Sequence, residues 1–158
     1  MKTVFVTGAS RGIGKIIAIQ LAKANYSVAL GYFKNKVITE ELVEELRKFN
    51  KNIISVNINL GNIESIREAK NTIKTSLGDV DILINNGAFS QEKDFFKINN
   101  DDLDKMFSIN VKGQFVCIQE FLPYMLQKNW GKIINISSIG GQWGGSNQIH
   151  YAASKAAL

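Results

Sequence analysis

Short apolar runs alternate along this chain with longer stretches in which apolar residues recur every three or four positions. Runs of this length predict buried strands, and the spacing between them predicts amphipathic helices. Strands that alternate with helices favour right-handed crossovers and a parallel sheet covered on both faces. The pattern therefore predicts an α/β fold with a doubly wound parallel sheet. The predicted strands span residues 2–7, 27–32, 53–58, 80–84 and 132–136.

The stretches between these runs predict helices whose bounds the sequence partly marks. The second helix should begin near Thr39, because a threonine followed by two glutamates suits a helix N-terminus. Gly78 should end the third, and Pro123 should kink or end a turn of a long helical region. A last helix should begin near His150. The apolar positions that carry these predictions are Ile13, Ile16, Ile17, Leu21 and Ala24; Leu42, Val43, Leu46 and Phe49; Ile66, Ala69, Ile73 and Leu77; and Leu103, Phe107, Val111, Phe115 and Ile118.

Composition narrows the classes of protein to consider. With 158 residues, of which 45% are hydrophobic and 21% charged, the chain suits one globular domain over residues 1–158. The net charge is +5, but the basic residues are scattered singly, so we expect solvated surface charge and no nucleic-acid partner. No apolar run approaches the roughly 18 residues of a membrane span. A single cysteine, Cys117, and an N-terminus that does not suit a secretory signal favour the cytoplasm.

A glycine-rich segment, Thr7–Gly14, lies between the first predicted strand and the first helix, with the sequence T-G-A-S-R-G-I-G. Nucleotide-binding sheets place their phosphate loop at this point. Gly8 allows a tight turn, Gly12 lets the backbone approach a pyrophosphate, and Gly14 lets the helix pack close to the strand. The free N–H groups of the helix start then face the anion. The alternative is an ordinary turn between strand and helix, since turns are rich in glycine.

The end of the second predicted strand bears on which dinucleotide would bind. A domain that selects NAD usually has an Asp or Glu there to accept from the ribose hydroxyls, and here no acid occurs before Glu40. Arg11, Lys34 and Lys36 could instead pair with a 2′-phosphate. The sequence favours NADP(H) over NAD(H). The alternative is that the lysines only solvate the sheet edge.

Four further motifs make the sequence resemble a known family. Asn85-Asn86-Gly87-Ala88 follows the fourth strand, Asn110 lies in the long helical region, Ser137-Ser138 ends the fifth strand, and Tyr151-Ala-Ala-Ser-Lys155 opens the last helix. With the glycine loop, they resemble the short-chain dehydrogenase/reductase family over the whole chain, most closely its 3-oxoacyl-[acyl-carrier-protein] reductase group. The resemblance implies a Rossmann fold and an enzyme that reduces a carbonyl to an alcohol, as in fatty acid biosynthesis. It also implies a small-molecule or acyl-carrier-protein-bound substrate and a homo-tetramer or dimer.

Residue types and spacing explain how such a set would act. Tyr151 and Lys155 are four residues apart, so they share one face of a helix. A cation beside the tyrosine favours the phenolate, and Tyr151 can then give a proton to a carbonyl oxygen or take one from an alcohol. The resemblance implies that Ser138 holds the substrate oxygen, that Asn110 anchors a water in a proton relay, and that Lys155 also binds the nicotinamide ribose.

The same resemblance implies a set of cofactor contacts, with two departures from the family pattern. The usual Asn-Asn-Ala-Gly is Asn-Asn-Gly-Ala here, so Ala88 lacks the conformational freedom of glycine. The acid that usually holds the adenine amino group is Asn59, which can accept without the charge. We expect a modest effect on affinity. The implied cofactor-binding residues are Gly8, Ser10, Arg11, Gly12, Ile13, Gly14, Lys34, Asn59, Leu60, Asn86, Gly87, Ala88, Tyr151 and Lys155.

Other notable residues are assigned weaker roles. His150 is the only histidine and no cysteine cluster accompanies it, so we expect no metal site and a surface or pocket-rim position. Trp143 should either line the substrate pocket or pack in its glycine-rich loop. Cys117 should be a small buried apolar residue. The Phe95–Phe96 pair should cover the cofactor cleft or contact a partner subunit.

Family members continue for two more strands and a substrate-binding segment, so we expect residues 1–158 to form a domain that is incomplete at its C-terminus. This piece alone should bind cofactor weakly and turn over slowly or not at all. Substrate choice stays open, because one fold hosts many substrates. The alternatives are a reductase or dehydrogenase of a sugar, polyol or other small carbonyl, and a nucleotide-binding protein without catalysis.

Overall fold

Five parallel strands form one sheet in the order β3-β2-β1-β4-β5 in a computed structural model, which describes residues 1–158. The strands are β1 (Thr3–Val6), β2 (Ser27–Tyr32), β3 (Ile53–Asn57), β4 (Ile82–Asn85) and β5 (Lys132–Asn135). The chain passes outward from β1 to β3, then crosses back over β1 to add β4 and β5 on the other side. This reversal confirms the predicted doubly wound α/β fold.

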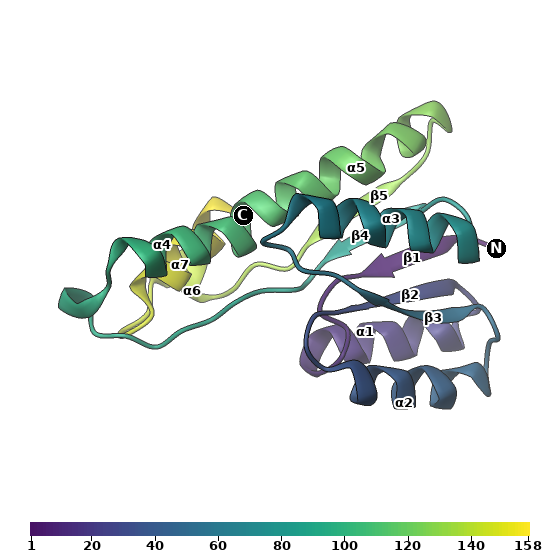
Figure 1. Cartoon of the computed structure of the whole chain (residues 1–158), viewed down its shortest axis with the longest axis horizontal. Coiled ribbons are helices and arrows are strands. Elements are labelled where there is room, and N and C mark those ends of the chain that lie inside the picture. The colour runs from purple at the N-terminus through teal and green to yellow at the C-terminus, as the bar shows by residue number, and fades with distance from the viewer.

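Helices cover both faces of this sheet (Figure 1). Side chains alternate along a strand, so Val4 and Val6 face one layer and Phe5 the other. Val4 and Val6 pack with α1 and α2, whereas Phe5 packs with α3 and α5. Figure 1 shows α4, α6 and α7 beyond the sheet, past the carboxyl ends of the strands. The helices are α1 (Gly12–Lys23), α2 (Lys36–Arg47), α3 (Ile63–Leu77), η1 (Phe95–Lys97), α4 (Asn100–Phe107), η2 (Ser108–Lys112), α5 (Gly113–Gln127), α6 (Gly140–Trp143) and α7 (Ile149–Ala157).

The first helix buries a face that only partly matches the predicted apolar positions. Ile13 and Ile16 are exposed, while Gly14, Ala18 and Ala22 are buried against the sheet. Small side chains let the helix approach the strands closely, since a Cβ on Gly14 would overlap the Gly8 carbonyl oxygen. The helix itself was predicted correctly, and Ile17 and Leu21 pack against the core as expected, beside the fully buried small residues.

The second helix begins at Lys36, not near Thr39 as predicted. Thr39 is buried inside the helix, where its hydroxyl donates to the Asn35 carbonyl at 2.7 Å instead of capping the end. The helix ends at Arg47, so Phe49 lies beyond it and is exposed. The third helix, by contrast, ends where expected, with Gly78 at a φ of 86°.

The long helical region is divided by a five-residue π-helical turn, Ser108–Lys112, between α4 and α5. The inward face is lined by Met106, Asn110 and Gln114, each four positions from the next, whereas Phe107 and Phe115 are exposed. Pro123 lies inside α5, which continues to Gln127. None of the helices combines the length and the apolar character that crossing a membrane requires.

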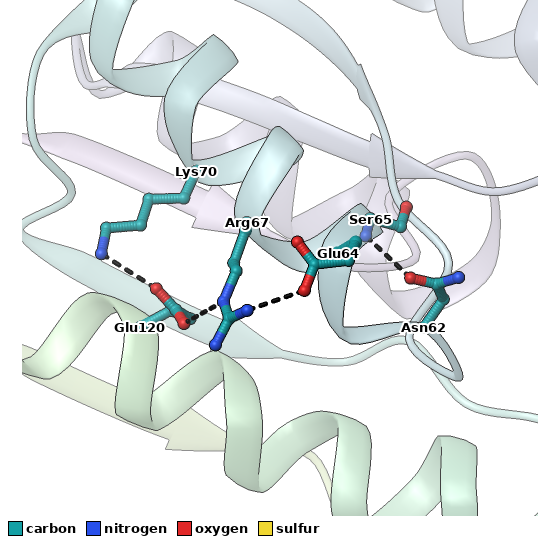
Figure 2. Close-up of polar contacts among 6 residues, drawn as sticks. All are labelled: Asn62, Glu64, Ser65, Arg67, Lys70 and Glu120. Atoms are coloured by element: carbon teal, nitrogen blue, oxygen red, sulfur yellow. Dashed lines mark hydrogen bonds and ion pairs between the residues drawn. The ribbon is translucent and has the colours of Figure 1, made fainter.

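An ion-pair cluster fastens α3 to α5 (Figure 2). The Glu120 carboxylate accepts from Arg67 Nε at 3.1 Å and from Lys70 Nζ at 3.0 Å. Arg67 also binds Glu64 at 2.7 Å. Hydrogen bonds from Arg67 and Lys70 lower the pKa of Glu120 below its ordinary value of 4.5.

We expect Glu120→Gln to lower the free energy of unfolding by about 0.5–1 kcal/mol at pH 7, the scale of a solvent-screened network. A depressed pKa in the folded state means that this contribution is present above pH 4.5 and is lost as the pH falls through the folded-state value. Urea unfolding at pH 7 and pH 3 measures it. Glu64→Gln is the control, because the Glu64 side chain is 71% exposed. An equal loss in both variants would contradict the central role of Glu120.

Candidate active site

A cleft of about 520 Å³ lies at the carboxyl ends of the strands, where the strand order reverses. This is where open α/β sheets bind ligands. The cleft brings together most of the predicted cofactor-binding residues with Tyr151 of α7. The lining residues are Gly8, Ser10, Arg11, Gly12, Ile13, Tyr32, Phe33, Lys34, Asn35, Ile58, Asn59, Leu60, Asn86, Gly87, Ala88, Phe89, Ser90, Lys105, Ile109 and Tyr151.

The glycine loop has the conformation that a phosphate loop requires. Gly8 and Gly12 have φ values of 65° and 56°, which disfavour side chains. A Cβ on Gly8 would lie 2.6 Å from the Gly87 Cα, whereas Gly12 has no atom within 4 Å of that position. No side chain caps α1, and its first turn holds no acid. The main-chain N–H groups in the first turn of α1 are therefore free to bind an anion. The glycine loop and this helix start fit the pyrophosphate of a dinucleotide.

Thr7 joins the glycine loop to the segment after β4. Its hydroxyl oxygen accepts from the N–H groups of Asn86 at 3.0 Å and Gly87 at 2.9 Å. The Asn86 side chain donates in return to the carbonyls of Thr7 and Gly8. The sequence did not predict this role for Thr7, although Thr7 directly precedes Gly8. These bonds fix the floor of the cleft.

The segment Gly87-Ala88, which replaces the family's usual Ala-Gly, shows no backbone strain. Ala88 is not among the residues with positive φ, so it does not need the freedom of glycine. Gly87 is closely surrounded, because a Cβ there would lie 2.9 Å from Leu60 Cδ1 and 3.3 Å from Gly8 N, so a side chain would require Leu60 to move. Gln114, buried on α5, donates to the Gly87 carbonyl at 2.5 Å. The expected loss of affinity at Ala88 therefore has no conformational cause.

Two predicted phosphate-binding cations line the cleft and one does not. Arg11 and Lys34 are exposed there and form no ion pair. Lys36 opens α2 outside the cleft and pairs with Glu40 at 3.8 Å, because α2 begins earlier than predicted. Asn35 donates to Ser10 Oγ at 3.2 Å and so ties the glycine loop to the end of β2.

Asn59 and Leu60 line the cleft beyond β3. Asn59 Oδ1 accepts from Gly61 N at 3.0 Å, and its main-chain N–H donates to Ser65 Oγ at 2.9 Å. The side-chain nitrogen of Asn59, Nδ2, makes no hydrogen bond within the protein. The side chain can therefore donate to an adenine ring nitrogen as well as accept through the second lone pair of Oδ1.

Tyr151, in the first turn of α7, lines the cleft, whereas Lys155, one turn further along, is buried and is not part of the lining. Tyr151 is half-buried, and its hydroxyl makes no hydrogen bond to protein. Lys155 is 3% exposed, and its ammonium donates to the Ile136 carbonyl at 2.7 Å. Burial lowers the pKa of Lys155 from its ordinary value of 10.5. Lys155 makes no hydrogen bond to the Tyr151 hydroxyl, and two of its three protons have no protein acceptor.

The two serines after β5 have different surroundings. The Ser137 hydroxyl donates to the Lys155 carbonyl at 2.7 Å, which ties the strand end to α7. The Ser138 hydroxyl accepts from Gly140 N at 3.2 Å and donates to no protein group. Ser138 therefore keeps a proton to offer, and Ser137 does not.

Asn110 is fully buried in the π-helical turn and holds two segments together. It exchanges hydrogen bonds of 2.8 Å with both main-chain groups of Phe89. Its amide nitrogen also donates to Ser154 Oγ at 2.9 Å, and Ser154 in turn donates to the Tyr151 carbonyl at 2.7 Å. Asn110 thus connects the cleft wall at Phe89 to the helix that carries Tyr151. π-Helical turns are frequent at functional sites.

His150 is not at the surface or on a pocket rim, as predicted, but 2% exposed. Its Nε2 lies 3.2 Å from Gln91 Oε1, and its Nδ1 has no partner. The helix start at Ile149 turns this side chain toward the segment after β4, which the sequence did not indicate. Cys117 is buried as predicted, and burial raises its pKa to about 12.

Three aromatic residues that the sequence analysis associated with the site do not line the cleft. Trp143, on α6, is 82% exposed and does not line the cleft. Phe95 and Phe96 are also exposed, with ring centroids 5.4 Å apart. They lie outside the cleft lining, which leaves the prediction of a partner contact untested and removes the prediction that they cover the cofactor cleft.

Comparison with known proteins agrees with this architecture. The short chain dehydrogenase family profile matches residues 2–158. The chain is 36% identical over 157 residues to the 3-oxoacyl-[acyl-carrier-protein] reductase of Staphylococcus epidermidis and 34% identical to that of Staphylococcus aureus. Each alignment covers 99% of this chain and 64% of the relative. The enzyme of the same name from Aquifex aeolicus is 34% identical over 160 residues, with 63% of its length covered. The chain therefore belongs to the short-chain dehydrogenase/reductase family.

Proposed function

We propose that the protein is an NADP(H)-dependent oxidoreductase that reduces a carbonyl to an alcohol, of the 3-oxoacyl-[acyl-carrier-protein] reductase type. One observation carries this proposal. A single cleft joins an uncapped helix N-terminus and glycine loop to the hydroxyl of Tyr151, which has no protein partner. Cofactor and reacting group would meet there.

The residues around the glycine loop would hold the cofactor. The N–H groups at Gly12 and Ile13 would face the pyrophosphate, and Asn59 with Leu60 would face the adenine. The nicotinamide supplies the hydride when the cofactor is bound. The Lys155 ammonium, held by the Ile136 carbonyl, has two protons left for the hydroxyls of the nicotinamide ribose.

Tyr151 would protonate the carbonyl oxygen of the substrate. Lys155 lies one turn further along α7, and its positive charge favours the phenolate that remains after proton transfer. Ser138 would donate a second hydrogen bond to the same oxygen, since its proton is not used within the protein. The positioned acid and the second donor both act on the charge that develops there.

Asn110 would support this set as a positioning residue. Its side-chain nitrogen, Nδ2, lies within hydrogen-bond distance of acceptors on Phe89, Met106 and Ser154. Its main-chain carbonyl and the second lone pair of Oδ1 are the groups that would anchor a water for a proton relay to Lys155. Through Ser154 it also fixes the turn of α7 that begins with Tyr151.

The substrate proposal rests on the relatives named above, and the chain spans 64% of the length of the first two. NADPH oxidation by the full-length natural protein should be faster with an acetoacetyl thioester than with keto-sugars. Preference for a keto-sugar would move the proposal to a sugar or polyol reductase. Cofactor binding without oxidation of either substrate would favour a protein without catalysis.

Cofactor selectivity gives a direct prediction. We expect the double variant Arg11→Ala, Lys34→Ala to lower kcat/KM for NADPH by about tenfold or more, the scale of lost hydrogen bonds to a charged group, with little change for NADH. Neither side chain has an acidic partner in the protein, so each is available to a 2′-phosphate. Lys36→Ala is the control, because Lys36 lies outside the cleft. Equal losses with both cofactors would refute a 2′-phosphate contact.

The proposal also includes a cytoplasmic location and a homo-tetramer or dimer. A buried free thiol at Cys117 is compatible with a reducing compartment. Exposed apolar side chains on the outer side of α4 and α5, among them Phe107, Phe115 and Leu126, favour a self-contact there. Sedimentation of the full-length protein would test the assembly, and a monomer at micromolar concentration would contradict it.

A further inference from the structure

Lys105 places an unpaired cation in the wall of the cleft. It lies in the last turn of α4, lines the cleft, and has its Nζ 4.3 Å from the centroid of the Phe89 ring. No acid lies within ion-pair distance of it. The nearby Asp102 is already bound by Lys93 and Gln91. The ammonium is thus held by a cation–π contact and is free to bind an anion.

The ring under Lys105 belongs to a segment that is hydrogen-bonded, through Asn110, to the helix that carries Tyr151. Both main-chain groups of Phe89 are bound by the Asn110 side chain, so the position of Phe89 is fixed. Asn110 also binds Ser154, whose hydroxyl donates to the Tyr151 carbonyl. Phe89 and Tyr151 both line the cleft. Lys105 therefore lies in the same cleft as Tyr151, on a residue whose main chain is tied to the helix that carries Tyr151.

Lys105 differs from the other cations of the cleft in the anionic group that it could bind. Its lining contains three cationic residues, Arg11, Lys34 and Lys105, and no acid. The anions of the proposed cofactor are already matched: the pyrophosphate by the start of α1, and the 2′-phosphate by Arg11 and Lys34. Lys105 comes from a different element, the helix after β4, and has no cofactor group left to neutralise.

We propose that Lys105, seated on Phe89, is a specificity-determining residue that binds an anionic group, such as a phosphate, on the carbonyl substrate. The inference rests on the proposed function and deepens it. Lys105 favours carbonyl substrates that also carry an anionic group over neutral carbonyl substrates of the same reactivity. Because the lysine is exposed, the attraction should weaken as the salt concentration rises.

The test compares two thioesters that share the same 3-oxoacyl group in the full-length natural protein. Acetoacetyl-coenzyme A carries phosphates, and acetoacetyl-N-acetylcysteamine carries no charge. We expect Lys105→Met to raise KM for the coenzyme A thioester about tenfold at low salt and to leave KM for the neutral thioester and for NADPH unchanged. Lys105→Arg should restore most of the difference, and Lys112→Met, which removes an exposed lysine outside the cleft, should have no effect.

Each alternative outcome identifies what is wrong. Equal KM changes for both thioesters would overturn the inference, because the effect would not depend on the anion. A raised KM for NADPH would overturn it by assigning Lys105 to the cofactor. No change for either thioester would overturn it and leave the proposed function standing. If the wild-type protein reduced neither thioester, the proposed function and this inference would both fall.

Discussion

Replacing Tyr151 by phenylalanine is expected to lower kcat at least about a hundredfold, the scale of losing a positioned general acid. The side chain lines the cleft, and its hydroxyl has no other hydrogen-bond partner in the protein. Removing that oxygen therefore breaks no structural contact. Cofactor affinity and the free energy of unfolding should both stay close to the wild-type values.

Single-turnover oxidation of NADPH measures the chemical step, and quenching of protein fluorescence measures cofactor binding. Tyr124→Phe is a matched control, because it removes a tyrosine hydroxyl on α5 outside the cleft. If Tyr151→Phe retained near-full turnover, the role given to Tyr151 would be wrong. If it lost cofactor binding in parallel, Tyr151 would be a binding residue and not the proton donor.

Replacing Lys155 by methionine should have two effects of different origin. Turnover should fall at least about a hundredfold, because the charge that favours the Tyr151 phenolate is removed. KM for NADPH should rise as well, since the ammonium has two protons left for the cofactor ribose. The rise in KM distinguishes this variant from Tyr151→Phe. A variant with unchanged KM for NADPH would contradict the ribose contact.

Lys155→Met should also change the pH dependence of stability. Burial lowers the pKa of Lys155 in the folded state below its ordinary value of 10.5, so the unfolded chain binds more protons between these two values. Stability of the wild-type protein should therefore rise with pH in that window relative to the variant. Urea unfolding of both proteins at several alkaline pH values measures the difference. If the difference in the free energy of unfolding between the two proteins did not change with pH, the lowered pKa of Lys155 in the folded state would be contradicted.

Features set by local chemistry were predictable from the sequence. The bounds of β2 were predicted as they are in the structure, because an apolar run between turn residues specifies a buried strand. The glycine loop was predictable because Gly8 and Gly12 adopt positive φ, which few other residues tolerate. The grouping of Tyr151 with the loop was implied by the resemblance to the family, whose motifs occur together in this sequence.

Features that depend on packing between distant segments were not predictable. The apolar spacing gave no sign of the π-helical turn at Asn110, and Phe107 and Phe115, which carried the helix prediction, are exposed. The burial of His150 depends on Gln91, which is 59 positions away in the sequence. The cation–π contact between Lys105 and Phe89 likewise requires that α4 pack beside the segment after β4.

The most direct test of the account is to compare NADPH and NADH oxidation by the full-length natural protein with an acetoacetyl thioester as the acceptor. The cleft holds Arg11 and Lys34 without acidic partners and Tyr151 with a free hydroxyl, so the account predicts a higher kcat/KM with NADPH. A clear preference for NADH would contradict the cofactor assignment, and oxidation of neither cofactor would contradict the proposed reaction.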